Sequence, residues 1–399
     1  MRLILLLAAL FLPAGLAAKE PARTVTVLVG IDGFRADYLA RGFTPRLAAL
    51  AKEGATGPMR PSFPTKTFPN HYALVTGKRP DRNGIVGNSM IDPRRPGVMF
   101  SLGNASQALD PFWWSEAEPI WITAERAGLR TATMFWPGSE VAFGGTRPSD
   151  WMRFDQNVTN VQRVNTLLDW LRRPAAIRPA FATIYFDTVD TVGHEFGPDS
   201  AELNAALAEV DARIGDIVDG AAKLGVRLNL VVVADHGMRA TDESRVIQLT
   251  DLIDKASYIA VETGPYAAIE PAAGTDDRVA EALLVPHEHM TCTRKEDLPE
   301  RLHWGKNPRV AAIICIAEAG WTILSGPPAY PVKGGAHGYD NADPEMLAIF
   351  IARGPAFARR VELPVFDNVA VAALLRAVLG LPQDADADGK LADVRAALK

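Results

Sequence analysis

The stretch Val25-Thr26-Val27-Leu28-Val29-Gly30-Ile31 runs without a break into Asp32. Leu228-Asn229-Leu230-Val231-Val232-Val233-Ala234 runs in the same way into Asp235 and His236, and a third apolar run, 181–186, leads towards Asp190. Short apolar runs of this kind are typical of buried strands. In an open α/β sheet, sites are built at the carboxyl ends of strands. The three runs therefore predict carboxylates and imidazoles gathered at one edge of a sheet, which favours a metal cluster over a solvated surface.

Strand-like runs alternate with helical patterns along the rest of the chain. Apolar residues recur at helical spacing from Leu203 to Val218, after Pro198-Asp199-Ser200, and again between Val161 and Leu171. Met346–Ile351 is a further apolar run typical of a buried strand. This alternation predicts an α/β fold with a doubly wound, mostly parallel sheet and helices on both faces.

Length and composition set bounds on the architecture and the substrate. The chain has 399 residues, 48% of them hydrophobic, which is ample for one large α/β domain or two smaller ones. A formal net charge of −5 gives no reason to expect a surface for duplex nucleic acid. An anionic substrate would need local positive charge, and bound metal ions would supply it.

Residues 1–18 are similar to a secretory signal peptide. Arg2 supplies the positive charge, Leu3–Leu12 is the apolar segment, and small residues lead to a predicted cleavage site near Ala17 or Ala18. A membrane anchor is the alternative, but the apolar run is shorter than the ~20 residues needed to span a bilayer. We therefore expect an exported protein without a stable membrane anchor. A short signal before one catalytic domain favours the bacterial periplasm, and secretion otherwise.

We expect residues 22–399 to form one catalytic domain with an inserted subdomain at about 240–333, a segment rich in Pro and charged residues. Both cysteines, Cys292 and Cys315, lie in this segment. In an exported chain they could form a disulfide, but two buried free thiols are an equal alternative because sequence does not show proximity. Three histidines of the segment have no paired spacing and are interpreted as structural or surface residues: His287, His289 and His303.

The segment Pro64-Thr65-Lys66-Thr67-Phe68-Pro69-Asn70-His71-Tyr72 carries the most specific signal. Pro69 suits the first turn of a helix that ends near Gly77, which places Thr67 at about the N-cap. A hydroxyl at a helix N-terminus faces free N–H groups that favour an anionic phosphate. If a metal binds the oxygen, the threonine can become a nucleophile. An ordinary helix cap is the alternative, and the metal-ligand candidates elsewhere decide against it.

Three further segments supply metal-ligand candidates, each of them weak alone. Asp190 and His194 are four residues apart, with Gly193 permitting a tight turn between them. Asp235 and His236 are adjacent at a predicted strand end, and His337 lies in the glycine-rich loop 334–338. Asp and His suit Zn²⁺, with Mn²⁺ as the alternative. Two metals close together would stabilise the attacking and leaving oxygens of an in-line displacement.

The acidic residues of 384–389 imitate the start of a calcium loop. Arg395 stands where such a loop needs a bidentate Glu, so we expect a solvated acidic tail instead.

Taken together, the motifs resemble those of the nucleotide pyrophosphatase/phosphodiesterase family, within the alkaline phosphatase superfamily. The resemblance covers essentially the whole chain after the signal and is carried, in order, by Ile31–Arg35, Pro64–His71, Gly84–Asn88, Pro119–Trp121, Phe135–Ser139, Asp190–His194, Gly197-Pro198, Asp235–Met238, Leu298–Leu302, Gly320-Trp321, His337–Tyr339 and Ala352–Pro355. It implies an alkaline-phosphatase-like fold, two zinc ions and a small nucleotide or phosphodiester substrate.

The resemblance also implies roles for single residues. One zinc ion would be held by Asp190, His194 and His337, and the other by Asp32, Asp235 and His236, with Thr67 bound to the second ion as nucleophile. Asn88 and the backbone N–H of Phe68 would hold a non-bridging phosphate oxygen. Thr67 would expel pyrophosphate or an alcohol, and water would then hydrolyse the phospho-threonine to release a nucleoside 5′-monophosphate.

Substrate choice rests on two aromatic residues. Phe68 matches a family aromatic that stacks on a nucleobase, and Phe154 stands where a Tyr is usual. Core packing is the alternative for Phe154, and Trp113-Trp114 either lines the pocket or fills the core. The segment 186–190 also departs from the family, in which Glu and Pro commonly precede the metal-binding Asp, and this can alter the pocket.

Two other functions are weighed against nucleotide hydrolysis. The Phe68 and Phe154 rings could equally face a quaternary ammonium, so a choline-headgroup or lysophospholipid phosphodiesterase of the same family is one alternative. A non-catalytic metal- or nucleotide-binding protein is the other. Thr67 argues against it, because metal capture alone needs no nucleophile at a helix start.

Overall fold

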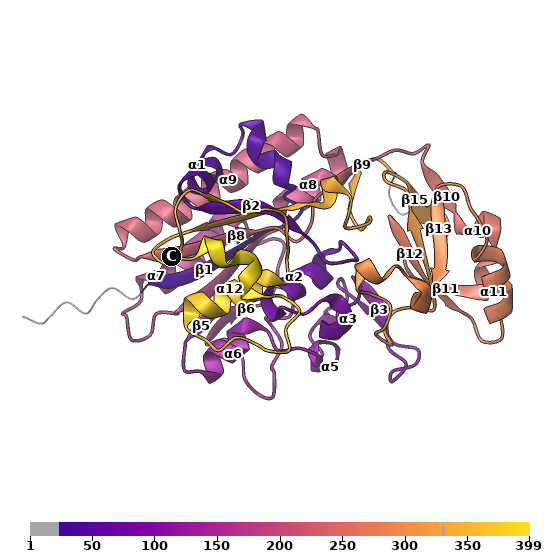
Figure 1. The fold of residues 1–399 in the computed structure, drawn as a ribbon, viewed down its shortest axis with the longest axis horizontal. Helices are drawn as coiled ribbons and strands as arrows, with labels where there is room; N and C mark the ends of the chain where they lie inside the picture. Colours follow the sequence, from indigo (N-terminus) through magenta and orange to yellow (C-terminus); the bar gives the residue numbers. More distant parts are fainter. Residues whose placement is uncertain (1–23, 329–330) are drawn as a thin grey trace, which may run out of the picture.

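A nine-stranded, mostly parallel sheet forms the centre of the molecule (Figure 1). In this computed structural model, which describes residues 24–328 and 331–399, β1 (Val25–Ile31) lies between β7 (Phe181–Phe186) and β8 (Leu228–Val233) and is parallel to both. These strands are the three apolar runs of the sequence, and nearly all of their residues are buried. The predicted signal peptide, residues 1–18, lies outside the described residues.

The sheet extends on both sides of these strands. β5 (Thr131–Met134) and β6 (Asp150–Met152) continue it in parallel beyond β7. On the other side, β17 (Ala348–Arg353) is antiparallel to both β8 and β2 (Ala55–Arg60). Two short strands, β18 (Val361–Glu362) and β19 (Phe366–Asp367), run parallel to β2. The strand predicted at Met346–Ile351 begins only at Ala348, because Pro344–Met346 forms a 3₁₀ turn.

Helices cover both faces of the sheet, as predicted (Figure 1). One face carries α1 (Pro45–Glu53), α7 (Asn160–Arg172), α8 (Thr188–Phe196) and α9 (Ala201–Lys223); the other carries α2 (Thr67–Thr76), α6 (Ile120–Arg126) and α12 (Ala370–Leu379). The two helices predicted from apolar spacing are confirmed as α7 and α9. Capping explains their starts: Thr159 and Gln162 form a capping box, and the Ser200 hydroxyl accepts the N–H of Leu203.

Between α2 and α6 the chain forms only short elements. They are α3 (Pro80–Asn83), β3 (Ser89–Ile91), β4 (Met99–Ser101), α4 (Ala105–Ala108) and α5 (Pro111–Trp114). Within the two described ranges, the structure contains no helix that combines the length and the apolar character needed to cross a bilayer.

A second, antiparallel sheet lies at one end of the molecule (Figure 1). Its strand order is β11 (Tyr258–Glu262), β12 (Tyr266–Pro271), β14 (Ile313–Ala317) and β13 (Met290–Arg294). A separate strand pair, β10 (Val246–Gln248) and β15 (Thr322–Leu324), lies beside it together with the helices α10 (Leu249–Leu252) and α11 (Asp276–Leu283). These elements share an apolar core of their own, around Ile269, Val279 and Leu283. They fall within 240–333, and the assignment of that range as an inserted subdomain stays a prediction.

The polypeptide leaves and re-enters the main sheet region through paired strands. β9 (Arg239–Thr241) and β16 (Gly334–Ala336) are antiparallel neighbours, with Arg239 opposite Ala336. His236 lies three residues before the first strand, and His337 directly follows the second. The pairing therefore brings two distant imidazoles together.

Contacts in the structure settle two questions that the sequence left outside the site: the state of the two cysteines and the setting of the acidic segment 384–389. Cys292 and Cys315 stand opposite each other on β13 and β14 and form a disulfide. The acidic segment 384–389 is solvent-facing as expected, with the Asp386 side chain 66% exposed, but it is not a free tail. Asp386 forms ion pairs with Lys78 and Arg82, which fix the segment against the end of α2 and against α3.

We expect replacement of both cysteines by Ala to destabilise the protein. The bond joins residues 23 positions apart, and releasing a loop of this length costs ~3 kcal/mol in the loop-entropy account. Urea unfolding followed by tryptophan fluorescence should give a lower midpoint for Cys292→Ala/Cys315→Ala than for the wild type. Wild-type protein unfolded in dithiothreitol should match the variant. Equal midpoints for oxidised and reduced wild type would contradict the bond.

Candidate active site

Parallel strand pairing places the two most buried carboxylates at the same edge of the sheet. Gly30 of β1 is in register with Val233 of β8, so Asp32 and Asp235 emerge at the same level. Asp32 is 1% exposed and Asp235 is fully buried. The N–H of Gly33 donates to Oδ1 of Asp235 at 3.2 Å, which ties the two strand ends together.

Asp190 and His194 lie on α8, so the tight turn expected at Gly193 is wrong. Their four-residue spacing puts both side chains on one face of the helix, with His194 Nε2 3.5 Å from Asp190 Oδ2. Gly193 is needed here for space rather than for a turn. A Cβ at Gly193 would lie 3.1 Å from the Met238 side chain, which packs against this face of α8.

Three imidazoles are oriented by backbone carbonyls. Nδ1 of His194, His236 and His337 lies 2.8, 2.9 and 2.8 Å from the carbonyl oxygens of Gly335, Gly237 and Thr65, respectively. A carbonyl only accepts, so each Nδ1 carries a proton and donates it. Nε2 of each ring is then left for the carboxylates or for a metal ion. Nε2 of His236 lies 2.9 Å from Asp235 Oδ2 and 3.4 Å from Asp32 Oδ1, and Nε2 of His337 lies 3.7 Å from Asp190 Oδ1.

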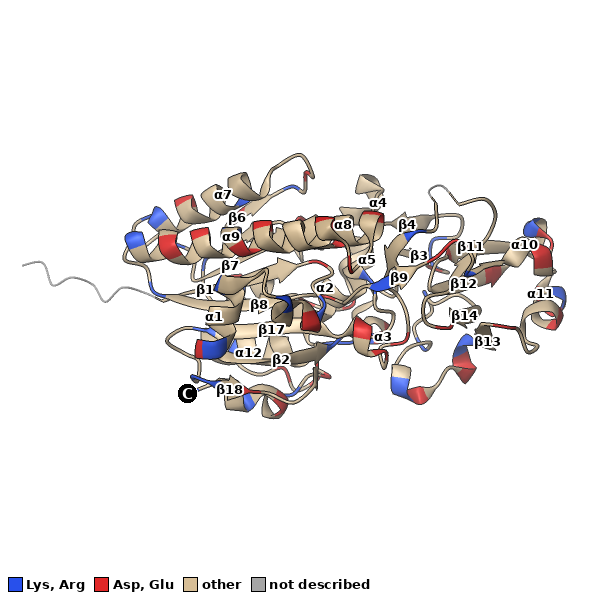
Figure 2. Cartoon of the chain, turned by 90° about the horizontal axis from the view of Figure 1, so that it is seen from above, with Lys and Arg blue, Asp and Glu red and all other residues tan. Residues whose placement is uncertain are grey.

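The carboxylate cluster is short of hydrogen-bond donors. Within the described ranges, Oδ1 of Asp32 and Oδ1 of Asp190 are buried and accept no hydrogen bond, and Oδ2 of Asp235 has only the imidazole nitrogens of His236 and His71 beside it. Burial, followed by the charges of Asp235 and Asp190, raises the pKa of Asp32 well above its usual value. On the outer surface, by contrast, Lys and Arg are interspersed with Asp and Glu (Figure 2). A buried group of unpaired carboxylate oxygens facing imidazole nitrogens fits a divalent cation.

Protons and metal ions would compete for this cluster. Burial opposes ionisation of Asp235, but the charges of His236 and His71 hold its pKa well below the usual value. Asp235 in turn raises the pKa of His236 in spite of burial. Burial, helped by the charge of His236, lowers the pKa of His337. The shifts of Asp235 and His236 favour positive charge beside this carboxylate, whereas the lowered pKa of His337 favours the neutral imidazole, the form that binds a metal ion.

Five of the six predicted ligands, together with His71, fall into two sets, and His194 belongs to neither, although its Nε2 lies 3.5 Å from Asp190. Ligand atoms within 4.8 Å of one another form the two sets Asp190, His236, His337 and Asp32, His71, Asp235. His236 therefore lies between the sets, and its ring stacks on that of His337 with centroids 3.5 Å apart. The assignment of each ligand to one ion stays a prediction.

Sequence reasoning missed His71 and Tyr185. His71 follows Thr67 by one turn of α2, and its Nδ1 lies 3.0 Å from the carbonyl oxygen of Thr67 and 3.3 Å from Asp235 Oδ2. Its ring packs against Trp136 and Tyr185. Tyr185 donates from its hydroxyl to Asp32 Oδ2 at 2.5 Å. The four-residue spacing from Thr67 was a usable signal for His71, whereas Tyr185 looks like any strand residue.

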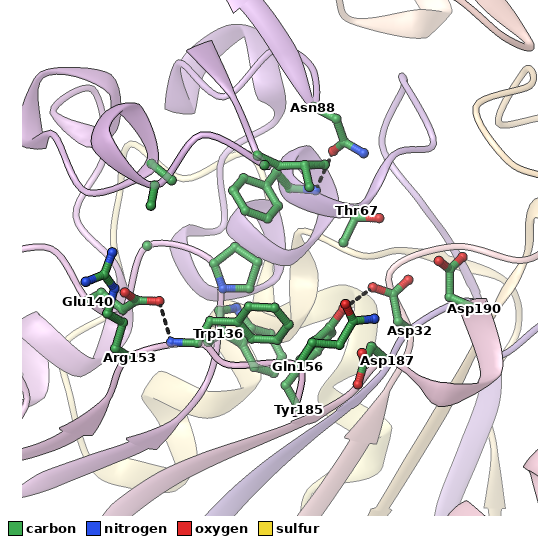
Figure 3. Close-up of a pocket in the computed structure, with 18 of the residues that line it drawn as sticks. Asp32, Thr67, Asn88, Trp136, Glu140, Arg153, Gln156, Tyr185, Asp187 and Asp190 are labelled. Carbon is green, nitrogen blue, oxygen red and sulfur yellow. Dashed lines mark hydrogen bonds between the residues drawn. The ribbon is translucent and has the colours of Figure 1, made fainter. Parts of the chain in front are cut away.

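Thr67 is the first residue of α2, one position later than predicted, because Lys66 occupies the N-cap. The alternative of an ordinary cap is therefore wrong. Oγ1 of Thr67 lies 3.3 Å from Nε2 of His236, beside the carboxylate cluster. The backbone N–H of Phe68, expected to bind phosphate, instead donates to Oδ1 of Asn88 at 3.0 Å. This bond turns the amide nitrogen of Asn88 to the side that faces Thr67 (Figure 3).

A cavity of about 570 Å³ opens beside these groups and is lined by Thr67, Phe68, Asn88 and Phe154, among others. Phe154 is 45% exposed, so core packing does not describe it. Trp114 lines the cavity with its ring 5.9 Å from Phe68, whereas Trp113 is buried elsewhere in the core. In the segment that departs from the family pattern, Asp187 lines the cavity and forms a 2.7 Å ion pair with Arg163.

Residues 26–340 match the sequence model of the family described as type I phosphodiesterase/nucleotide pyrophosphatase. The chain belongs to this family. It is 37% identical over 365 residues to human ectonucleotide pyrophosphatase/phosphodiesterase family member 5, covering 91% of this chain and 76% of the human one. It is 36% identical over 371 residues to the Xenopus laevis bis(5′-adenosyl)-triphosphatase, covering 91% of this chain and 80% of the frog protein.

Solved structures agree with the sequence comparison. Human family member 5 superposes with a TM-score of 0.90 at 35% identity, over 94% of this chain and all of that one. An inactive threonine-to-alanine variant of the murine family member 5, in complex with AMP, has a TM-score of 0.89 at 34% identity, with the same coverage. The fold is alkaline-phosphatase-like, as predicted, and the protein is a hydrolase of the pyrophosphatase/phosphodiesterase type.

We expect His236→Ala and His71→Gln to differ in metal content. Nε2 of His236 faces the carboxylates. In His71 the nitrogen near Asp235 is Nδ1, which the Thr67 carbonyl already engages, and Nε2 lies beside Gly30, where the ring packs against Trp136 and Tyr185. We therefore expect His71 to support the site from outside the ligand set. Proteins loaded with zinc and dialysed should contain two ions per chain in the wild type and in His71→Gln, but about one in His236→Ala, by plasma mass spectrometry. A lost ion in His71→Gln, or two ions in His236→Ala, would refute this.

Proposed function

We propose that this hydrolase is a two-metal phosphodiesterase that cleaves nucleotide phosphodiester and phosphoanhydride bonds through a phosphorylated Thr67. The observation that carries the proposal is the position of Thr67 Oγ1, at the first turn of α2 and 3.3 Å from His236 Nε2, beside the buried carboxylates of Asp32 and Asp235. The triphosphatase name of the frog relative and the AMP complex of the murine one support a nucleotide substrate. The product would be a nucleoside 5′-monophosphate.

The proposed ligands form two sets of three residues, and Thr67 joins one of them. Asp190, His194 and His337 would hold one cation, and Asp32, Asp235 and His236 would hold the other, together with Thr67 Oγ1. Zinc suits this set of oxygen and nitrogen donors, and manganese is the alternative. When bound, the two ions would supply the positive charge that neutralises the phosphate and favours ionisation of the Thr67 hydroxyl.

Residues of the chain then carry out the displacement at phosphorus. Thr67 Oγ1 attacks phosphorus, its bond to phosphorus forms as the bond to the leaving oxygen breaks, and the phosphoryl group is held on Thr67. The amide nitrogen of Asn88 donates to a non-bridging oxygen, where charge develops. The positive end of the α2 dipole adds to this attraction. Water then attacks the phospho-threonine, and Thr67 leaves as the hydroxyl.

The cavity favours a flat group next to the phosphate. Phe68 and Phe154 both line it, and stacking on two aromatic rings is worth roughly 1–3 kcal/mol per base. The same rings suit a quaternary ammonium, so a choline-headgroup or lysophospholipid substrate is the competing proposal. The names of the relatives favour the nucleotide. We further propose that the protein is exported, since its disulfide is typical of oxidising compartments.

Thr67→Ala should keep both metal ions but lose turnover by several orders of magnitude, because it removes only the attacking oxygen. Thr67→Ser, the matched control, keeps that oxygen and should retain a large part of the activity. Hydrolysis of the p-nitrophenyl ester of AMP measures both. Wild-type turnover by Thr67→Ala would rule out the nucleophile.

A substrate comparison separates the nucleotide from the choline proposal. We expect a higher kcat/KM for the p-nitrophenyl ester of AMP than for p-nitrophenylphosphorylcholine, because the stacked base adds binding energy. Release of p-nitrophenol is the same readout for both esters. A higher kcat/KM for the choline ester would overturn the nucleotide assignment and leave the two-metal chemistry standing.

A further inference from the structure

One acidic side chain of the second sheet lies beside the segments that carry the proposed nucleophile and amide donor. Glu262 ends β11, and β11 lies next to β3, the strand that begins directly after Asn88 (Figure 1). The pairing of β11 with β12 shifts between Ala260 and Glu262, so Val261 is an extra residue in a β-bulge. Bulges re-aim the side chains around them and are common next to active sites. Val261 packs in the core of the main sheet, and Glu262 follows it to the junction of the two sheets.

Both oxygens of Glu262 lie beside residues that adjoin the proposed catalytic groups. Oε2 accepts the backbone N–H of Ser89 at 2.9 Å, and Ser89 directly follows Asn88. Oε1 lies 4.0 Å from the ammonium of Lys66, which occupies the N-cap of α2 directly before Thr67. One carboxylate therefore engages the neighbour of the amide donor and the neighbour of the nucleophile.

Lys66 and Glu262, called the Lys66–Glu262 pair below, hold each other in a confined place. The Lys66 side chain is only 10% exposed, and its ammonium lies 5.8 Å from the centre of the Tyr266 ring. A Cβ at Gly338 would lie 2.8 Å from Lys66 Cε, so the alkyl chain passes close to the backbone there. Burial raises the pKa of the Glu262 carboxyl, and the charge of Lys66 opposes this rise. The ammonium thus favours the ionised carboxylate and fixes where it lies.

The Lys66–Glu262 pair lies behind the cavity rather than in its wall. Thr67 and Asn88 line the cavity, whereas in the part of the chain that the structure describes the two side chains of the pair do not. Any effect of the pair on the reaction must therefore pass through the residues next to it. Thr67 belongs to a helix, but Asn88 lies between two short elements, α3 and β3. Its backbone is held by the N–H of Leu102, which donates to its carbonyl at 3.0 Å, and by the Glu262 contact to the following residue.

We propose that Glu262 is a positioning residue: by binding the Ser89 N–H, it holds the amide of Asn88 where the transferring phosphate needs a donor. Lys66 places the carboxylate for this contact. The inference rests on the proposed function, in which Thr67 attacks phosphorus and Asn88 donates to a non-bridging oxygen. Charge develops on that oxygen in the transition state, so a displaced donor lowers kcat more than it raises KM.

Two variants separate the reach of the Glu262 side chain from its charge. Glu262→Gln keeps an oxygen that reaches the Ser89 N–H and removes the charge, whereas Glu262→Asp keeps the charge and is one methylene shorter. We expect Glu262→Gln to retain kcat within about threefold and Glu262→Asp to lose about 10- to 100-fold, with KM changed less than about threefold in both. Hydrolysis of bis(p-nitrophenyl) phosphate and of the p-nitrophenyl ester of AMP gives kcat and KM, and urea unfolding shows that each variant is folded.

The same substitution in a second background shows whether the effect passes through Asn88. Asn88→Ala has no amide to position, so adding Glu262→Asp to it should lower kcat by less than about twofold, because two changes that act through one group are not additive. An equal loss in both backgrounds would overturn the inference and leave the proposed function standing. So would wild-type kcat in folded Glu262→Asp, or a loss in Glu262→Gln as large as in Glu262→Asp. Wild-type kcat in Asn88→Ala would instead overturn the proposed role of Asn88, and this inference with it.

Discussion

Burial of ionised carboxylates is the constraint on which the rest of the structure depends. Asp32 and Asp235 stand at the ends of fully buried parallel strands, where an unpaired anion is costly. Each neighbouring element brings positive charge or a ligand towards them. The α8 helix adds His194, the β9–β16 pair adds His337 beside His236, and α2 adds Thr67. Carbonyl groups fix Nδ1 of these three histidines, which leaves every Nε2 for the cluster.

The second sheet is joined to this centre by buried polar contacts. Glu262 at the end of β11 accepts the N–H of Ser89 at 2.9 Å and lies 4.0 Å from the ammonium of Lys66. Ser89 follows Asn88, and Lys66 precedes Thr67. Arg309, before β14, is fully buried and pairs with Asp92 at 2.8 Å. The positions of the nucleophile and of the amide donor thus depend on residues of both sheets, which explains why the catalytic segments are spread over most of the chain.

Much of this arrangement follows from the sequence, because each carboxylate comes directly after an apolar run and parallel strands end at one edge. The helical spacing of apolar residues in the sequence likewise predicted α7 and α9. Other features depend on packing. Gly193 and its β-branched neighbours disfavour a helix, yet contacts of α8 with α9 and β16 override that preference. His71 reaches Asp235 only once the first turn of α2 packs beside Trp136 and Tyr185, and the disulfide needs the register of β13 and β14.

Anomalous diffraction from crystals of the zinc-loaded protein, collected above and below the zinc edge, tests most directly whether the six predicted ligands hold two metal ions next to Thr67. We expect two peaks, one in contact with Asp190, His194 and His337, the other in contact with Asp32, Asp235 and His236 and with Thr67 Oγ1. A single peak, or a peak bound directly by His71 in place of His236, would contradict this expectation.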